Sequence, residues 1–140
     1  MAGCEAAWQA ANMGIQVTLY EMRPKVKTFA HQTEKLGEMV CSNSFRSNDH
    51  EQNAVGLLHW EMMRANGLVI STAYEHKLPA GGALAVDRDE FANSITNKLK
   101  SHPNIKISYE EVTSLPNEGK WIVATAVSYT HLRAHETVSH

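Results

Sequence analysis

The sequence predicts an α/β domain of the Rossmann-like type, and three observations near its start favour this class. Residues 3–12 are rich in alanine and have no breaker after Gly3, which predicts a helix. Gly14 stands where a helix-ending glycine is expected. Residues 15–20 then alternate apolar and polar side chains, as a strand does, and lead to Glu21. The order helix, glycine turn, strand and acid is that of the second half of a nucleotide-binding βαβ unit.

The middle of the chain predicts two further helices. Residues 54–66 read as a helix that ends near Asn66 and Gly67, and its expected apolar face carries Val55, Leu58 and Met62. Asp87 is placed to cap a second helix that begins near Arg88 and ends at residues 102–104. The apolar stripe expected on this second helix consists of Phe91, Ile95 and Leu99.

Two more strands are predicted towards the end of the chain. Residues 105–109 alternate as a strand does, and residues 121–125 form a short apolar run typical of a buried strand. Residues 79–82 contain Gly81 and Gly82, which permit either a close approach of the backbone to a ligand or an ordinary turn. Trp8 and Trp60 lie on predicted helices and are expected to be packing residues.

The composition excludes several classes of protein. The chain has 140 residues, 43% hydrophobic and 20% charged, with a net charge of −2, which fits one soluble domain and gives no global reason to bind nucleic acid. No membrane-spanning run or secretory signal is present. Two cysteines are too few for a disulfide framework, so a cytoplasmic location is expected. The eight histidines are scattered, and we expect no metal site.

Both ends of the chain depart from this pattern. The helix at Gly3 has no strand before it, so we expect a partial Rossmann-like FAD- or NAD(P)-binding domain over residues 1–126 that lacks its first strand. Residues 127–140 have no clear period and are similar to translated adapter sequence. We therefore interpret residues 127–140 as an unrelated, artefactual tail and exclude them from the prediction of fold and function.

Residues 40–48 carry the strongest indication of chemistry. Cys41 stands in a run of small polar residues that contains Arg46, so a thiol, several hydrogen-bond donors and a cation lie close together in sequence. This mixture suits a site for an anionic or planar polar ligand. Arg46 would favour a thiolate at Cys41. The alternative is a buried structural cysteine, because free cysteine is commonly buried.

Several segments together resemble the N-terminal part of the folate- and FAD-dependent tRNA uracil-5-methyltransferases. They occur in the order of that family over residues 2–125, and a full-length member is much longer. The related flavoproteins that modify the wobble uridine of tRNA are less similar through residues 40–56. The matching segments are residues 2–8, 19–24, 40–48, 53–58 and 79–91.

The resemblance implies a set of cofactor contacts. Ala2 and Gly3 match the end of the glycine-rich turn that holds the FAD pyrophosphate. Glu21 lies close to the spacing expected for the acid that accepts ribose hydroxyls, with a solvated strand-end carboxylate as the alternative. Thr125 follows Ala124 at the start of a second flavin-contacting turn. Arg23, like Arg46, is expected either to contact flavin phosphate or the RNA backbone, or to be an exposed surface arginine.

The resemblance also implies a role for Cys41, which matches one of two active-site cysteines of the family. Addition of a thiolate to C6 of uracil makes an enolate that can attack a methylene carried by reduced flavin, and a second group then removes the C5 proton. The role that Cys41 takes stays open. The carbon donor would be 5,10-methylenetetrahydrofolate, NAD(P)H would supply electrons, and tRNA would be the substrate and partner.

Two alternatives to an intact methyltransferase remain from the sequence. A generic FAD- or NAD-dependent oxidoreductase would share the helix, strand and Glu21 but would have no use for Cys41 in its polar run. A chimeric reading frame without activity is the other alternative. The chain as given is expected to be inactive and not to retain FAD.

Overall fold

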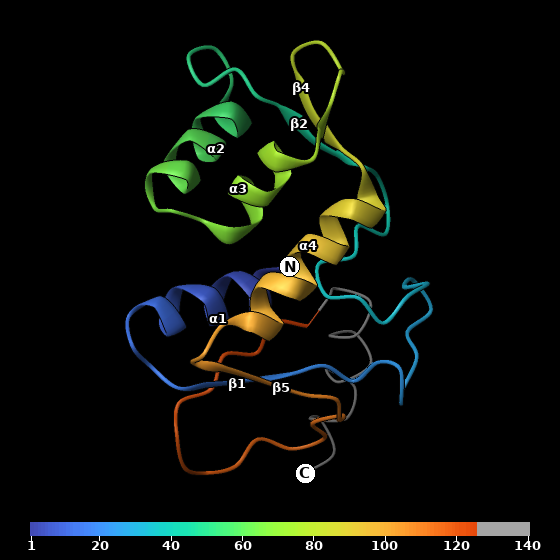
Figure 1. Ribbon diagram of the computed structural model, residues 1–140, viewed down its shortest axis with the longest axis vertical. Helices are drawn as coiled ribbons and strands as arrows, with labels where there is room; N and C mark the ends of the chain where they lie inside the picture. The colour runs from blue at the N-terminus through green and yellow to red at the C-terminus, as the bar shows by residue number, and fades with distance from the viewer. Residues whose placement is uncertain (126–140) are drawn as a thin grey trace, which may run out of the picture.

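The computed structural model describes residues 1–125 of the 140 and contains two small sheets and four helices (Figure 1). One sheet has two parallel strands, and the other has three antiparallel strands in the order β2-β4-β3. The strands are β1 (Val17–Tyr20), β2 (Ser44–Ser47), β3 (Lys77–Leu78), β4 (Ala83–Val86) and β5 (Ile105–Ser108). The helices are α1 (Ala2–Asn12), α2 (Ala54–Arg64), α3 (Leu68–Glu75) and α4 (Arg88–Ser101).

The predicted helix, turn and strand at the start of the chain are confirmed. Gly14 ends α1 with a φ of +86°, a conformation that favours glycine. β1 then runs parallel to β5, with Val17 opposite Ile105 and Leu19 opposite Ile107. Since parallel strands need a crossover connection, the long path between β1 and β5 carries all the remaining described elements except α1. The α/β, Rossmann-like class predicted from the sequence is confirmed.

Helix α4 crosses the molecule and supplies the centre of the core (Figure 1). Asp87 caps it by accepting hydrogen bonds from the backbone N–H groups of Asp89 and Glu90. The predicted stripe of Phe91, Ile95 and Leu99 is fully buried. Each such side chain contributes about 1.5–3 kcal/mol by leaving water. The stripe packs in one cluster with residues of α1, α3 and β4, including Ala7, Leu68, Ile70, Leu84 and Val86.

The middle of the chain differs from the prediction. The helix expected over residues 54–66 ends at Arg64, and α3, which no part of the prediction included, follows after a turn at Asn66 and Gly67. α3 is buried through Leu68–Ile70, so a short apolar run that fits several structures became a helix. Leu58, which was expected on the apolar face of α2, is 52% exposed. The neighbouring His59, which was not expected there, is buried.

The strand predicted over residues 121–125 is wrong. This segment has no strand pairing among the described residues, and Ile122 is 74% exposed. It is held instead by Trp121, whose ring stacks on Tyr20 at 5.8 Å and whose Nε1 donates to the Glu118 carbonyl. An apolar run forms a strand only where a neighbouring strand offers hydrogen bonds, and none of residues 1–125 does so here.

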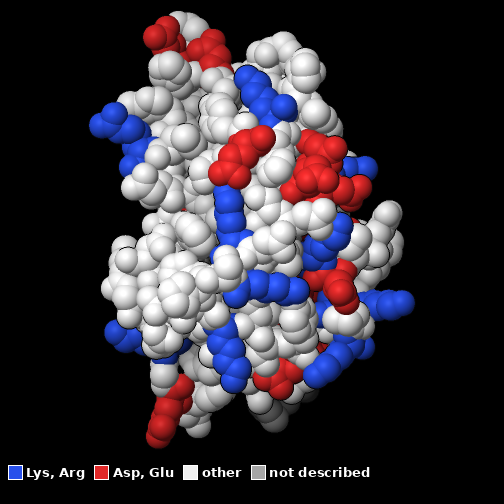
Figure 2. Space-filling view, in the orientation of Figure 1, with Lys and Arg blue, Asp and Glu red and all other residues white. Residues whose placement is uncertain are grey.

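The surface carries charges of both signs. Figure 2 shows acidic and basic side chains interspersed on this face, without a large field of one sign. Among residues 1–125, no helix qualifies as a membrane span, and the longest of them has 14 residues. The same residues bring together no group of three or more His, Cys, Asp or Glu side chains that could hold a metal ion. Residues 127–140, interpreted above as a tail, lie outside the described part of the chain.

Candidate functional site

Cys41 lies on an exposed loop that is fixed immediately downstream. The thiol is accessible, so the alternative of a buried structural cysteine is wrong for Cys41. Asn43 holds the loop against β4, because its carbonyl accepts from the Val86 N–H at 2.9 Å and its side chain donates to the Val86 carbonyl at 3.2 Å. The buried structural cysteine is Cys4, where burial raises the pKa of the thiol.

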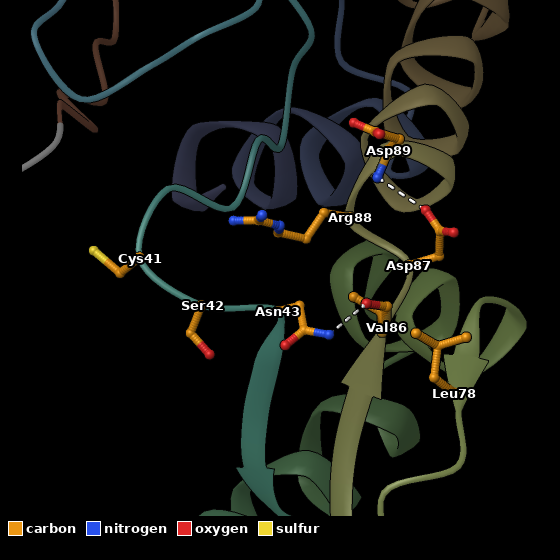
Figure 3. A pocket seen from close by; sticks show the side chains of 8 residues that line it. All are labelled: Cys41, Ser42, Asn43, Leu78, Val86, Asp87, Arg88 and Asp89. Carbon is orange, nitrogen blue, oxygen red and sulfur yellow. Dashed lines mark hydrogen bonds between the residues drawn. The ribbon is translucent and has the colours of Figure 1, made fainter.

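An open cleft of about 540 Å³ adjoins Cys41 (Figure 3). It forms where the loop before β2 meets the end of β4 and the first turn of α4. Its lining residues carry a thiol, an amide, hydroxyl and carboxylate groups and one guanidinium. The lining residues are Cys41, Ser42, Asn43, Leu78, Val86, Asp87, Arg88 and Asp89.

The cation of this cleft is Arg88, and the expected Arg46 is not among the lining residues. Figure 3 shows the Arg88 side chain extending from the start of α4 towards the loop that carries Cys41. Arg46 is exposed at an irregularity of β2 and has a φ of +70°. Arg46 was expected near Cys41 because the two are close in sequence. The irregularity of β2 changes the direction of its side chains, and for this reason closeness in sequence did not place Arg46 in the cleft.

A second, smaller hollow of about 200 Å³ shares Arg88 and Asp89 with the cleft. Its other wall is the loop that precedes Cys41, including Lys35 and Glu38. Arg88 thus lies where the two hollows meet. The remaining lining residues are Ala30, Gln32, Thr33, Met39, Val40 and Ala92.

Arg23 organises the loop that leads to Cys41. The side chain of Arg23 is only 8% exposed, so the alternative of an exposed surface arginine is wrong for Arg23. It forms ion pairs with Glu21 at 2.8 Å and Glu38 at 3.1 Å. It also donates to the carbonyls of Thr33 and Lys35. These contacts engage all five N–H donors of the side chain, so in this structure none is free for a phosphate.

Glu21 is ionised and retains capacity to accept one more hydrogen bond. Burial opposes ionisation, but the hydrogen bonds and charge of Arg23 outweigh it and hold the pKa of Glu21 below its usual value. Three of about four lone-pair positions of the carboxylate are taken, all by N–H groups of Arg23. The carboxylate is therefore not merely solvated, and its free position can accept a hydroxyl.

The predicted cofactor residues lie together at one edge of the parallel sheet. Gly3, in the first turn of α1, lies beside Ala124 and Leu19, and a Cβ there would make ordinary van der Waals contacts with them at 3.4 Å and 3.8 Å. Thr125 follows Ala124, and Ala2 is exposed at the start of the helix. A helix N-terminus, which offers N–H donors, beside an acid at the end of the adjacent strand, which accepts, is an arrangement that fits a dinucleotide. None of these residues lines the Cys41 cleft.

Asn48, the last residue of the polar run 40–48, is held by hydrogen bonds to His59 and Tyr74. Asn48 Oδ1 lies 2.7 Å from the Tyr74 hydroxyl and 3.1 Å from His59 Nδ1, and its N–H donates to the Gly82 carbonyl. Burial lowers the pKa of His59, so the ring is neutral at neutral pH. Gly82 belongs to the turn between β3 and β4, and a Cβ added to it would meet no atom within 4 Å. Residues 79–82 therefore form a turn between β3 and β4, as the second of the two interpretations expected.

The two tryptophans differ. Trp8 is partly buried against the core and meets His102 edge to face at 5.3 Å, which confirms the expected packing role. Trp60 is 45% exposed, so the packing role expected for it is wrong. Its ring stacks with His50 and lies under the Arg64 guanidinium.

Sequence reasoning missed the contributions of Arg88, Glu38 and Asn43. Arg88 had one available signal, because it directly follows the helix cap Asp87, where a cation is unfavourable to the helix. Glu38 and Asn43 gave no such signal. Their roles depend on partners that are distant in sequence, Arg23 for Glu38 and Val86 for Asn43.

Comparison with known proteins agrees with the predicted resemblance. The sequence model of the family described as "Glucose inhibited division protein A" matches residues 1–139. That match gives no support to the interpretation of residues 127–140 as unrelated sequence. Over 125 residues, the chain is 73% identical to a protein of Ruegeria sp. (strain TM1040) and 70% identical to one of Jannaschia sp. (strain CCS1). A protein of Dinoroseobacter shibae is 68% identical.

All three relatives carry the name methylenetetrahydrofolate–tRNA-(uracil-5-)-methyltransferase TrmFO. The matched part is 89% of this chain but only 27–28% of each relative. The chain therefore spans little more than a quarter of the relatives' length. On the match of the family model across residues 1–139, the chain belongs to the glucose inhibited division protein A family.

Proposed function

We propose that this chain supplies one active-site thiol and part of the FAD-binding unit of an enzyme that methylates C5 of uridine in tRNA. The observation that carries the proposal is the accessible Cys41 beside an open polar cleft. Relatives that are 68–73% identical to it over 125 residues are named for this reaction, with methylenetetrahydrofolate as the folate. Because the chain spans about 28% of their length, the activity belongs to the longer protein.

The chemistry gives Cys41 one of two tasks. In the first, its thiolate forms a bond to C6 of uracil, and the electron pair of the C5–C6 double bond moves towards the C4 carbonyl, which makes C5 nucleophilic. In the second, another nucleophile forms the bond to C6, and the Cys41 thiolate acts as the base that removes the C5 proton after the new carbon bond has formed. The bond between the other nucleophile and C6 then breaks. Either task needs an accessible sulfur at a cleft that admits a planar base, which fits the position of Cys41.

The residues around the parallel sheet would hold the flavin. Ala2, Gly3 and Thr125 would receive the dinucleotide at the start of α1, and Glu21 would accept a ribose hydroxyl at its free lone-pair position. When bound, the flavin would supply the reduction that turns a methylene into a methyl group, with NAD(P)H as the electron source. Arg23 would hold Glu21 ionised and correctly oriented.

The test uses a full-length chimera in which residues 1–125 replace the matching part of the Ruegeria relative. Cys41→Ala is expected to abolish tRNA methylation while flavin absorbance is retained, because Cys41 does not belong to the flavin-binding residues. Cys4→Ala is the matched control, since that thiol is buried, and should keep most of the methylation. If Cys41→Ala methylates tRNA at the wild-type rate, the proposed role is wrong. A generic flavin oxidoreductase would instead retain its oxidase activity and show no methylation in either protein.

A further inference from the structure

Glu38 is the acid through which the loop before Cys41 reaches the buried guanidinium of Arg23. Its Oε2 accepts from Arg23 Nη1 at 3.1 Å, and its side chain is 13% exposed. The same carboxylate accepts the backbone N–H groups of Gln32 and Thr33 at 2.8 Å and 3.1 Å, and the Thr33 hydroxyl at 3.0 Å. One side chain therefore closes the turn of this loop and also joins the loop to Arg23.

The same guanidinium holds Glu21 immediately after β1. Arg23 Nε donates to Glu21 Oε1 at 2.8 Å and Nη2 donates to Oε2 at 2.9 Å, so both oxygens of the carboxylate are engaged. The third nitrogen, Nη1, donates to Glu38 and to the Thr33 carbonyl. Because the guanidinium is planar and rigid, a change in its orientation that breaks its bonds to one carboxylate also disturbs its bonds to the other.

Cys41 follows Glu38 by three positions, and the chain is anchored on both sides of the thiol. Upstream, Met39 is buried in the core cluster. Downstream, Asn43 forms two hydrogen bonds with Val86 of β4. Only the short exposed segment 40–42 lies between these anchors. The place of the sulfur is therefore set by the loop that Glu38 fastens.

Stability alone is a weak reason for this arrangement. Two carboxylates and one guanidinium lie together with side chains that are 8–16% exposed, and replacing such buried ionic groups by packed apolar residues is often neutral or stabilising. The three side chains carry one more negative than positive charge, which suits a ligand that donates hydrogen bonds. A ribose hydroxyl is such a donor, and Glu21 has a lone-pair position left to accept it.

We infer that Glu38 is a positioning residue: by way of Arg23, it couples the loop that presents Cys41 to a ribose bound at the end of β1. A hydroxyl bonded to Glu21 holds that carboxylate, and with it the guanidinium, in the orientation that Glu38 also requires. The bound ribose and the ordered loop therefore favour each other, and by linkage the effect is the same in both directions. That the ribose belongs to FAD and that Cys41 reacts rest on the proposed function, whereas the coupling does not.

The first test measures hydrogen exchange of residues 36–43 by mass spectrometry in the full-length chimera, with adenosine diphosphate as the probe. This compound is the half of FAD that carries the ribose, and it lacks the flavin ring that could itself cover the thiol. Saturating adenosine diphosphate should slow exchange in the wild-type chimera by about fivefold, at the lower end of typical couplings between sites. Glu38→Gln, which keeps the size of the side chain but not its charge, should show little or no slowing. It should also weaken binding of adenosine diphosphate by a similar factor, because the coupling is reciprocal.

Two controls isolate the link. Glu34→Gln makes the same change in the same loop, at an exposed acid that takes part in none of the described ion pairs, and should behave as the wild-type chimera does. The 2′,3′-dideoxy form of adenosine diphosphate has no ribose hydroxyl for Glu21 and should not slow exchange. Glu38→Asp keeps the charge and should retain part of the effect.

The second test measures tRNA methylation by the same chimeras at saturating FAD. Glu38→Gln should lower kcat and leave the KM for tRNA nearly unchanged, because the thiol is misplaced after the RNA has bound. Saturating FAD excludes weaker cofactor binding as the cause. Glu34→Gln should keep the wild-type kcat.

Two results would overturn the inference. One is slowing of exchange by adenosine diphosphate that is absent from the wild-type chimera or equal in Glu38→Gln. The other is equal slowing by the dideoxy compound, which would assign the effect to the phosphates. Exchange of the buried amides of α4 reports unfolding, and if it rises in Glu38→Gln the comparison is made with Glu38→Asp. The exchange test requires no methyl transfer, so the coupling can fail while Cys41→Ala still abolishes methylation, and it can hold where the proposed reaction fails.

Discussion

Replacing Arg23 with methionine tests whether the ion network at the end of β1 stabilises the loop that leads to Cys41. The variant removes five N–H donors and leaves the carboxylates of Glu21 and Glu38, which are 16% and 13% exposed, without their cation. Breaking a buried pair in this way costs about 3–5 kcal/mol, because one charge is left buried and unpaired. Since whole domains are stable by about 5–15 kcal/mol, we expect a large fall in the free energy of unfolding at neutral pH.

The pH dependence gives this prediction its sign. Despite burial, hydrogen bonds hold the pKa of Glu21 and that of Glu38 below the usual 4.5. A lowered folded-state pKa contributes stability that is present above the unfolded value and is lost as the pH falls through the folded value. Arg23→Met removes most of the hydrogen bonds to Glu21, so the stability difference between wild type and variant should shrink as the pH falls below 4.5.

Urea unfolding followed by far-ultraviolet circular dichroism, at about pH 7 and at steps below 4.5, measures both quantities. Lys106→Met is the control, because Lys106 is exposed on β5 and its replacement should change stability by less than about 0.5 kcal/mol. Arg23→Lys, with three donors in place of five, should fall between wild type and methionine. A difference below about 1 kcal/mol for Arg23→Met at neutral pH, or one that does not shrink in acid, would refute the reasoning.

Three further substitutions, two of them paired with a control, test the fold that positions the site. Gly56→Ala should destabilise the fold by about 1–3 kcal/mol or more, because a Cβ there would overlap the Asp49 carbonyl. Gly82→Ala is the control, since a Cβ there would meet no atom within 4 Å, and equal urea unfolding midpoints for the two variants would contradict the prediction. Phe91→Ala should lower the free energy of unfolding by about 3–5 kcal/mol, because Phe91 is fully buried. Leu57 is 44% exposed, so Leu57→Ala should lower it by less than about 1 kcal/mol, and equal shifts in melting temperature would contradict the assigned core. Glu5→Gln should cost about 0.5–2 kcal/mol, since its carboxylate accepts the Leu68 and Val69 N–H groups at the start of α3; unchanged hydrogen exchange in α3 would argue against this.

The sequence predicted those elements whose signals are local. Gly14 ends α1, Asp87 caps α4, and the spacing of Phe91, Ile95 and Leu99 places one face of α4 in the core. Each of these depends on residues within a few positions of one another. The conformational freedom of glycine and the helical period are therefore sufficient to predict them.

The features that the sequence did not predict depend on distant partners. Residues 121–125 have the composition of a strand but no strand beside them among the described residues. Residues 68–75 form a helix whose first amides bind Glu5, more than sixty positions away. The cation of the cleft that adjoins Cys41 is Arg88, the first residue of α4, instead of Arg46. Such tertiary contacts override local propensity and local spacing.

The most direct test of the central claim is a product assay with isotope-labelled folate. The chimera that carries residues 1–125 is incubated with tRNA, NADH, FAD and 5,10-methylenetetrahydrofolate labelled in its methylene carbon, and the nucleosides are then analysed by mass spectrometry. The proposed function predicts labelled 5-methyluridine, which is lost in Cys41→Ala. Unlabelled tRNA from a chimera that has bound flavin would contradict it.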